Sequence, residues 1–514
     1  MGLGRSWSVA LTGVTGRLVS VEADVGNGLP SFALIGLPDT ALSEARERVR
    51  AAVTNSEENW PKQKITVSMS PADLRKSGAG FDLVLALVVL AAAARVPQEA
   101  LADLAVLGEL GLDGSVRGLR GVLPAVATAS RAGLGRVLVP RTNATEAALV
   151  PDVEVLAVSS LREALALLRG EEVPEQLQLE VPTRRPDARR PQLDLAEVRG
   201  QLEARRALEV AAAGGHHVFL HGSPGVGKTM LAERLSGLLP PLTRRDALAV
   251  TEIHSVAGLL PADVPLISSP PYLQPHHSAT QAAIVGGGSR EIRPGAISLA
   301  HRGVLFLDEA TEFRGGVLDS LRGPMESGEV VIFRSGLTAC FPADFLLVLA
   351  ANPCPCGRAG LGAGAACTCS SIVRRRYLGR LSRPLLDRVD IQVMVDRPSR
   401  AELLAGSDGE STAVVADRVR LARARSAHRL AGTPWTLNAH LPSRLLRARL
   451  RTEEPATRIV EAALDRGTLT ARGLDRVLRV AWTLADLAGR DRPGVDELGA
   501  ALALRAGWQS GWAA

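Results

Sequence analysis

The chain has 514 residues, 46% of them hydrophobic, which is enough for about three domains that each bury a core. Its 60 basic and 54 acidic residues give a net charge of +6, which is compatible with nucleic-acid binding but does not establish it. No secretory signal is recognisable at the start, and the longest apolar run, 83–94, is shorter than the roughly 20 residues that a membrane-spanning helix needs. We therefore expect a cytoplasmic protein that does not enter the membrane.

The pattern of apolar residues divides the chain into three parts. Residues 1–170 mix strand-like and helix-like segments; within them, 64–71 alternates as a strand and 83–94 reads as a buried helix. Charged and proline-bearing residues at 171–192 predict a linker. Residues 193–398 alternate strands with helices and motif-bearing loops, and 399–514 is mostly helical. The prediction is an α/β protein with one domain in each of these three parts.

A glycine-rich loop follows the apolar segment that ends at 221 and precedes a helical pattern. Its sequence has the G-x-x-x-x-G-K-[ST] spacing of a phosphate-binding loop, in which backbone N–H groups and a helix N-terminus attract phosphate. We expect Lys228 to reach the β- and γ-phosphates of a nucleotide and Thr229 to hold Mg²⁺. The predicted nucleotide-binding residues are Gly222, Ser223, Pro224, Gly225, Val226, Gly227, Lys228 and Thr229.

A second apolar segment, 303–307, ends in the acidic pair Asp308 and Glu309. A buried parallel strand would deliver both carboxylates to its carboxyl end, where open α/β sheets bind ligands. We expect Asp308 to position Mg²⁺ and Glu309 to orient and deprotonate the attacking water.

Four of the five cysteines lie together, in a C-x-C-x₁₀-C-x-C pattern: Cys354, Cys356, Cys367 and Cys369. In a reducing cytosol, clustered cysteines favour metal or redox chemistry over structural disulfides. Four thiolates suit tetrahedral zinc, with free thiols and a redox switch as alternatives. Cys340 fits no ligand pattern and is expected to be a buried small residue.

Residues 275–313, 351–357 and 381–393 together resemble the magnesium-chelatase-like AAA+ ATPases of the YifB/ComM type. Residues 29–53 and 70–87 are similar to the same family, so the resemblance covers nearly the whole chain. It implies an α+β N-terminal domain with the fold of the Lon-protease catalytic domain and ribosomal S5, a P-loop AAA+ α/β core and an all-α C-terminal lid. It also implies ATP and Mg²⁺ as cofactors.

The resemblance assigns roles to three further residues. Asn352, at the end of another apolar segment, would contact the γ-phosphate or the water. Arg388 would lie at the subunit edge and face the ATP of a neighbouring subunit, and Arg472 would sense nucleotide from the lid. The alternatives are a strand-end turn for Asn352, an internal ion pair of Arg388 with Asp387 or Asp390, and Arg476 or Arg479 in place of Arg472.

A Lon-like domain raises the hypothesis of a peptidase with a serine–lysine dyad. In the segments that resemble Lon, Gly80 occupies the serine position and Arg120 the lysine position, while Ser77 falls three positions early. Arginine stays charged and cannot act as a general base. We therefore expect no peptidase activity, and a folded interaction or assembly module instead.

The resemblance implies a homo-hexameric motor on single-stranded or branched DNA: a helicase that promotes branch migration in recombination or the integration of transforming DNA, with recombination proteins as candidate partners. A predicted hairpin at 328–345 bears Arg334, a candidate DNA contact, and a basic run contains Arg374, Arg375, Arg376 and Arg380. His276 and His277 could touch nucleic acid or cap a helix, and a local structural role is the favoured interpretation. Two alternatives are a magnesium-chelatase-type ATPase that drives metal insertion and an ATP-regulated partner-binding module.

Overall fold

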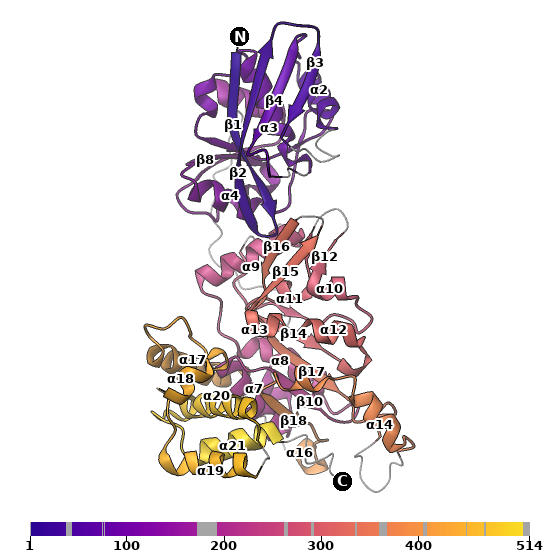
Figure 1. The fold of residues 1–514 in the computed structure, drawn as a ribbon, viewed down its shortest axis with the longest axis vertical. Coiled ribbons are helices and arrows are strands. Elements are labelled where there is room, and N and C mark those ends of the chain that lie inside the picture. The colour runs from indigo at the N-terminus through magenta and orange to yellow at the C-terminus, as the bar shows by residue number, and fades with distance from the viewer. Residues whose placement is uncertain are drawn as a thin grey trace.

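The computed structural model describes residues 2–36, 44–74, 76, 78–171, 193–261, 266–288, 292–334, 337–358, 367–404, 409–448, 450–466 and 469–506. Figure 1 shows an N-terminal region around one sheet, a central region around a second sheet, and a helical region at the side of the second sheet. Apart from Glu171, the predicted linker 171–192 lies outside the described residues.

The N-terminal region is built on a seven-stranded sheet in the order β3-β4-β2-β1-β5-β8-β9. β1 and β2 pair antiparallel along their whole length, and β5, β8 and β9 continue the sheet in parallel. The strands are β1 (Gly2–Thr12), β2 (Thr15–Gly26), β3 (Ser31–Ile35), β4 (Lys64–Ser70), β5 (Leu104–Val106), β8 (Arg136–Pro140) and β9 (Glu154–Val158). The short strands β6 (Glu109–Leu110) and β7 (Val116–Arg117) pair separately.

Helix α3 (Asp82–Ala92) forms the centre of this region, and all of its residues are buried. It packs directly on β1, where a Cβ atom at Gly4 would lie 2.0 Å from the Val88 carbonyl oxygen. Its apolar residues on every side are therefore covered by protein, which confirms the prediction of a buried helix. The other helices are α2 (Ala45–Asn55), α4 (Val122–Arg131), α5 (Ala144–Ala147) and α6 (Leu161–Arg169).

The central region contains a five-stranded parallel sheet in the order β11-β14-β17-β10-β18. Its strands are β11 (Tyr272–Leu273), β14 (Val304–Leu307), β17 (Leu346–Ala351), β10 (Val218–His221) and β18 (Ile391–Met394). β10, β14 and β17 are buried along their whole length, as expected of a parallel sheet covered on both faces. Because β14, β17 and β10 are neighbours, the loops that follow them meet at one edge of the sheet.

Helices and two hairpins surround this sheet. The helices are α7 (Leu202–Gly214), α8 (Lys228–Leu238), α9 (Arg244–Ala257), α10 (Gln281–Val285), α11 (Ala296–Leu299), α12 (Gly315–Ser320), α13 (Pro324–Ser327), α14 (Ser371–Leu378), α15 (Arg383–Leu386) and α16 (Arg400–Leu404). The hairpins pair β12 (Gly286–Gly287) with β13 (Arg293–Pro294), and β15 (Glu329–Arg334) with β16 (Leu337–Pro342). The second hairpin confirms the one predicted at 328–345.

The C-terminal region is helical: α17 (Thr412–Arg429), α18 (Ser443–Ala448), α19 (Glu454–Asp465), α20 (Ala471–Ala488) and α21 (Val495–Ala506). The predicted fold class, α/β with a P-loop core and a helical C-terminal part, is confirmed. A search of the described helices finds none with the length and apolar character needed to cross a bilayer.

The N-terminal region touches the central region at two places (Figure 1). The turn between β1 and β2 lies against β16, where a Cβ atom at Gly13 would be 2.9 Å from the Cys340 carbonyl oxygen. Helix α4 packs on α9, and the Gly121 N–H donates to the Ser255 carbonyl at 3.2 Å. The N-terminal sheet therefore contacts the β15–β16 hairpin directly.

Of the residues considered for a Lon-like dyad, Arg120 has a described contact with the central region. Ser77 lies outside the described residues. Arg120 packs against the end of α9, because a Cβ atom at Gly258 would lie 2.7 Å from the Arg120 Nε. Arg120 thus lies at the contact between the two regions, which fits the predicted assembly role better than a catalytic one.

A candidate nucleotide site and a separate arginine-lined cavity

The glycine-rich loop connects β10 to α8, as the sequence predicts. Gly225 and Gly227 have φ values of +76° and +94°, a region that other residues rarely adopt. This conformation folds the loop around the Lys228 ammonium, which donates to the carbonyl oxygens of Gly222 at 2.7 Å and Ser223 at 2.9 Å. Burial lowers the pKa of Lys228 to about 8. A buried ammonium in such a loop suits a phosphate.

Thr229 and Asp308 supply oxygen atoms beside this loop. The Thr229 hydroxyl donates to the Asp308 carboxylate at 2.7 Å, and the Glu309 N–H donates to the other oxygen of that carboxylate at 2.9 Å. A hydroxyl and a carboxylate at this spacing are the protein ligands that Mg²⁺ takes when nucleotide phosphates provide the rest. These two residues fit the predicted metal role.

Asn352 and Glu309 complete the same edge of the sheet. The Asn352 side-chain oxygen accepts from the Lys228 ammonium at 3.0 Å. Glu309 has φ +48° and ψ +46°, an uncommon conformation for a residue with a side chain, and its side chain is 53% exposed. The sheet order therefore brings the predicted lysine, threonine, two acids and asparagine together from three strands.

His277 belongs to this site too, and the sequence analysis missed its contact. Its Nδ1 atom lies 3.4 Å from a carboxylate oxygen of Glu309, and its ring packs on His276 with centroids 4.1 Å apart. Three residues separate His277 from the end of β11, the strand beside β14. That position could have been inferred only with the strand order known.

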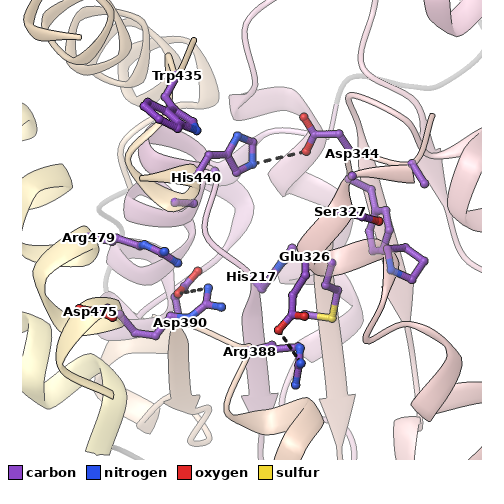
Figure 2. A pocket seen from close by; sticks show the side chains of 18 of the residues that line it. His217, Glu326, Ser327, Asp344, Arg388, Asp390, Trp435, His440, Asp475 and Arg479 are labelled. Atoms are coloured by element: carbon purple, nitrogen blue, oxygen red, sulfur yellow. Dashed lines mark hydrogen bonds and ion pairs between the residues drawn. The ribbon is translucent and has the colours of Figure 1, made fainter. Parts of the chain in front are cut away.

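A cavity of about 650 Å³ lies elsewhere (Figure 2). It is bounded by α13, the start of β17, the residues before β18 and the helical C-terminal region α17–α21, here called the lid. Arg388 and Arg472 both line it, together with Arg476, Arg479, Glu326 and Asp475. None of the described residues that line this cavity belongs to the glycine-rich loop or to the acidic pair. The predicted site residues Arg388 and Arg472 therefore lie in a cavity that is separate from the glycine-rich loop.

Arg388 is held inside this cavity by contacts other than the expected ones. Its guanidinium pairs with Glu326 at 2.5 Å (Figure 2). It also donates to the Pro384 carbonyl at 2.6 Å. Arg388 therefore does form an internal ion pair, as the alternative expected, but its partner is Glu326 rather than Asp387 or Asp390. Glu326 comes from α13, and its side chain is more than half exposed, so the pair is open to exchange.

The three lid arginines differ in what they contact. Arg476 donates to the buried Asp390 at 2.9 Å, and Arg479 donates to the Leu441 carbonyl at 2.8 Å. Although burial alone would raise it, the pair with Arg476 holds the pKa of Asp390 well below its usual range. Arg472, in the first turn of α20, is exposed at the cavity. Arg476 and Arg479 therefore have structural partners, which favours Arg472 for the predicted nucleotide contact.

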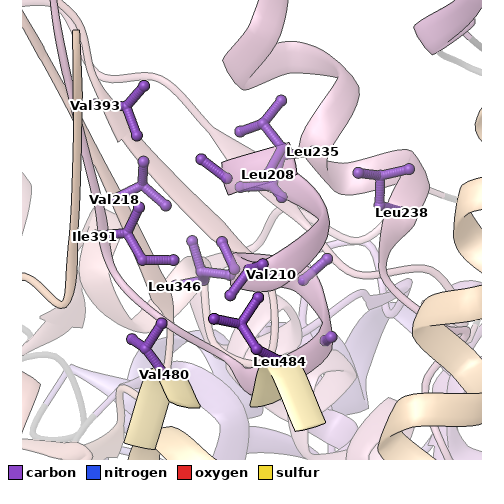
Figure 3. Close-up of a cluster of buried hydrophobic side chains, with 14 of the residues drawn as sticks. Leu208, Val210, Val218, Leu235, Leu238, Leu346, Ile391, Val393, Val480 and Leu484 are labelled. Carbon is purple, nitrogen blue, oxygen red and sulfur yellow. The ribbon is translucent and has the colours of Figure 1, made fainter. Parts of the chain in front are cut away.

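The lid is held rigidly against the sheet that carries the loop. Figure 3 shows Val480 and Leu484 of α20 in one apolar cluster with Val218 of β10, Ile391 of β18 and Leu235 of α8. All five are at most 5% exposed. Burial of this kind stabilises by about 1.5–3 kcal/mol for each large apolar side chain. The helix that carries the lid arginines is thus packed against the sheet.

The four clustered cysteines lie beside the nucleotide site. Their sulfur atoms all fall within 4.8 Å of one another, and Cys367 Sγ lies 3.7 Å from that of Cys354 and 3.6 Å from that of Cys356. All are free thiols. The turn that follows Cys356 touches the glycine-rich loop, since a Cβ atom at Gly357 would lie 2.4 Å from the Pro224 ring. This cluster could hold one metal ion.

Cys340 lies apart from that cluster. It is partly exposed rather than buried, because it stands on the β16 edge of a two-stranded hairpin. Its thiol donates to the Glu329 carboxylate at 3.2 Å, and its pKa is raised to about 11 by burial and by this carboxylate.

The fold and the nucleotide site define a protein of the magnesium-chelatase-like AAA+ class. Three family models match in chain order: "Subunit ChlI of Mg-chelatase" at residues 21–143, "Magnesium chelatase, subunit ChlI" at 194–403 and "Magnesium chelatase, subunit ChlI C-terminal" at 409–505. Within this class, the chain belongs to the YifB/ComM family.

Relatives from three bacteria match nearly the whole chain. The uncharacterized protein Rv2897c of Mycobacterium tuberculosis is 51% identical over 505 residues, which cover 98% of this chain and 99% of the relative. The competence protein ComM of Haemophilus influenzae is 38% identical over 510 residues, 98% of either chain. The protein YifB of Escherichia coli is 39% identical over 485 residues, 94% of this chain and 93% of the relative.

Proposed function

We propose that this protein is an ATP-hydrolysing hexameric motor that moves single-stranded or branched DNA. The observation that carries the ATPase proposal is the convergence of Lys228, Thr229, Asp308 and Glu309 at one edge of a parallel sheet. The DNA proposal is supported by the likeness to the competence protein ComM along the whole chain. A helicase that drives branch migration is the activity that these features favour.

Each residue of the site has a defined task in hydrolysis. Lys228 would neutralise the β- and γ-phosphates, and Thr229 and Asp308 would hold the Mg²⁺ that bridges them. Glu309 would accept the proton of the attacking water as it adds to phosphorus. Asn352, already bonded to Lys228, would keep the lysine and the water in position.

The cavity that holds Arg388 and Arg472 supports a composite site. Its described lining contains neither the glycine-rich loop nor the acidic pair, which supports the proposal that these arginines meet a phosphate from another subunit. A neighbour's γ-phosphate would replace Glu326 as the partner of Arg388. A closed ring, which we propose to be a homo-hexamer, would satisfy this requirement for every subunit at once.

The β15–β16 hairpin offers a surface for DNA. Phe333 is 75% exposed next to the exposed Arg334, which combines an aromatic ring for base stacking with a charge for phosphate. Arg374, Arg375 and Arg376 are exposed on α14. Such contacts bind the backbone and the base faces, so binding should depend strongly on salt and little on sequence.

The test is ATP hydrolysis measured with no DNA, with single-stranded DNA and with forked DNA. We expect stimulation by DNA in the wild type and its loss in Arg334→Ala and Phe333→Ala. Arg458→Ala, which removes an exposed arginine of the lid helix α19, is the matched control and should stay stimulated. Hydrolysis indifferent to every DNA form would contradict the DNA proposal and favour a magnesium-chelatase-type or partner-binding ATPase.

We also propose that Cys354, Cys356, Cys367 and Cys369 bind a structural zinc ion. A tetrahedral zinc site with Zn–S bonds of about 2.3 Å has sulfur atoms about 3.8 Å apart. Three of the sulfur–sulfur separations here are 3.3, 3.6 and 3.7 Å, and all four sulfur atoms lie within 4.8 Å of one another, a spacing that one ion could draw together. A disulfide would need sulfur atoms about 2.05 Å apart. The ion would join the turn against Pro224 to the start of α14, and so brace the glycine-rich loop.

Metal analysis of protein purified without chelator tests this site. We expect about one zinc per chain, its loss in the double variant Cys354→Ser/Cys356→Ser, and its retention in Cys340→Ser. Wild-type protein without zinc, or a double variant that keeps it, would overturn the assignment.

A further inference from the structure

We infer that Asp390 is a positioning residue for the ATP of the neighbouring subunit. Its ion pair with Arg476 joins the segment of Arg388 to the helix of Arg472, so that the two cavity arginines keep one spacing. The inference rests on the proposed composite site and deepens it, because it names what holds the two arginines together. Three observations carry it: the burial of the pair, the place of each partner in the chain, and the anchoring of the segment that carries Asp390.

The Asp390 carboxylate lies where the lid meets the sheet, and it is fully buried. Arg476 donates to one of its oxygens at 2.9 Å, and His216 Nδ1 lies 3.3 Å from the other. A buried carboxylate is costly unless a charged partner is bonded to it. The pair with Arg476 is therefore kept wherever the lid is docked on the sheet.

Each partner stands close in the chain to one of the two cavity arginines. Asp390 comes two residues after Arg388, in the short link between α15 and β18, and Figure 2 shows both in the cavity. Arg476 comes four residues after Arg472 in α20, which places the two on one side of that helix. The ion pair therefore reaches directly from one arginine-bearing segment to the other.

The short link that carries Asp390 is anchored on both sides. The next residue, Ile391, begins β18, and its N–H donates to the His217 carbonyl at 3.1 Å. The carbonyl of the preceding Val389 accepts from Arg505 of α21 at 3.1 Å. Because the sheet and the lid both hold this link, the spacing of the two cavity arginines depends on the geometry of the buried pair.

That spacing should affect the rate of hydrolysis more than the binding of ATP. Both arginines would act on charge that develops in one transition state, and a misplacement of about 1 Å can cost about 10²-fold in rate. Without the carboxylate, the Arg476 guanidinium would also be free to compete with Arg388 for anions in the cavity. Loss of the Asp390 charge should therefore lower kcat at the neighbour's site and leave the chain's own affinity for ATP little changed.

The first experiment compares Asp390→Asn with Asp486→Asn. Asparagine keeps the size of the side chain and one acceptor but removes the charge, so Asp390→Asn should lower kcat about 10-fold to 100-fold and change ATP affinity about threefold or less. Asp486 is a second buried carboxylate, carried by α20, and it pairs with Arg429 inside the lid. Asp486→Asn is the matched control and should keep kcat within about twofold. Thermal unfolding of both variants measures the loss of stability that they share.

The second experiment assigns Asp390 to one side of the subunit boundary by mixing chains. Asp390→Asn mixed with Glu309→Gln should regain part of the ATPase activity, because some interfaces then combine an intact acid with an intact ion pair. Asp390→Asn mixed with Arg388→Ala should regain none, since both changes affect the same side of the interface.

Several results would overturn the inference: wild-type kcat in Asp390→Asn, an equal fall in kcat in Asp486→Asn, no recovery with Glu309→Gln, or recovery with Arg388→Ala. The outcome for Arg388→Ala separates this inference from the composite site. Wild-type turnover in Arg388→Ala would refute the composite site and the inference with it. A slow Arg388→Ala beside a wild-type Asp390→Asn would refute the inference alone.

Discussion

The Lys228 ammonium and the Asn352 side-chain oxygen lie 3.0 Å apart, and this bond joins the glycine-rich loop to the end of the neighbouring strand β17. Lys228 has one partner outside its own loop here, and that partner is a neutral acceptor. A neutral acceptor can hold the lysine without competing with the charge of a phosphate. We therefore propose that Asn352 positions the lysine for a nucleotide rather than neutralising it.

Replacing Asn352 should separate binding from turnover. Asn352→Ala removes the acceptor but leaves the lysine charge, so we expect kcat to fall about 10-fold to 100-fold, with ATP affinity changed about threefold or less. Steady-state kinetics beside a direct binding titration measure the two effects. A fall in ATP affinity as large as the fall in kcat would show that Asn352 contributes to binding of ATP in the ground state.

Lys228→Ala should weaken nucleotide binding. The lysine is nearly buried and is the cation at the centre of the loop, so its removal takes away a charged contact of about 1.5–3 kcal/mol. Titration with a fluorescent ATP analogue should show affinity reduced about 10-fold to 100-fold or more. Lys64→Ala, which changes an exposed lysine of β4, is the control and should bind as the wild type does.

Glu309→Gln should bind ATP and hydrolyse it slowly. The amide keeps the shape of the side chain but cannot accept the proton of the water, so we expect kcat to fall about 10²–10⁴-fold. Single-turnover measurements with bound ATP separate this defect from product release. A variant that turns over at the wild-type rate would remove Glu309 from the catalytic role.

Arg388→Ala should bind ATP and fail to hydrolyse it, because the proposal assigns the missing guanidinium to the neighbour's site. By analogy with arginine fingers, the loss is about 10³–10⁵-fold in rate. Mixing Arg388→Ala with Glu309→Gln chains should restore part of the activity, since some interfaces then combine an intact acid with an intact arginine. Arg322→Ala, a more exposed arginine paired with Asp319, is the matched control. Wild-type turnover in Arg388→Ala alone would exclude the role in the neighbour's site.

Acid should destabilise the central region through buried histidines. Burial lowers the pKa of His301 and of His221 to about 4, below the usual value of 6.5. Between those values the unfolded chain binds more protons than the folded one, so stability is full above about pH 6.5 and falls toward pH 4. At about pH 5 each histidine costs about 2 kcal/mol.

His301 allows a specific test of that acid effect. Its Nδ1 accepts the backbone N–H of Asp344 at 3.0 Å, and protonation would remove that acceptor. His301→Asn keeps an acceptor that does not titrate. The fall in Tm from about pH 7 to about pH 5 should be smaller in His301→Asn than in the wild type. An equal fall in both proteins would show that His301 does not contribute.

The sequence predicts much of the nucleotide site because its signals are local. The spacing from Gly222 to Thr229, the apolar run before Asp308 and the apolar run before Asn352 each define a strand and the loop after it. Parallel strands then require their carboxyl ends to meet at one edge. The buried helix α3 could be predicted equally well from the sequence, because its apolar residues leave no polar side to face solvent.

The contacts that the sequence does not predict join segments far apart in the chain. His277 meets Glu309 only because β11 lies beside β14, and Arg388 and Arg472 line one cavity only because the lid folds back onto the sheet. The turn at Gly13 reaches Cys340 only because the N-terminal sheet lies against the β15–β16 hairpin. Periodicity reports which face of an element is buried, but it does not report which element covers that face.

The most direct test of the account is branch migration on a labelled three-way or four-way DNA junction, with ATP, by the wild type and by Glu309→Gln. A DNA motor powered at this site predicts ATP-dependent strand exchange by the wild type, suppressed by rising salt because phosphate contacts are lost. The Glu309→Gln protein should bind the same junction and form no product. Equal amounts of product from both proteins would contradict the proposed DNA motor. So would the absence of product from a wild type that hydrolyses ATP and binds the junction.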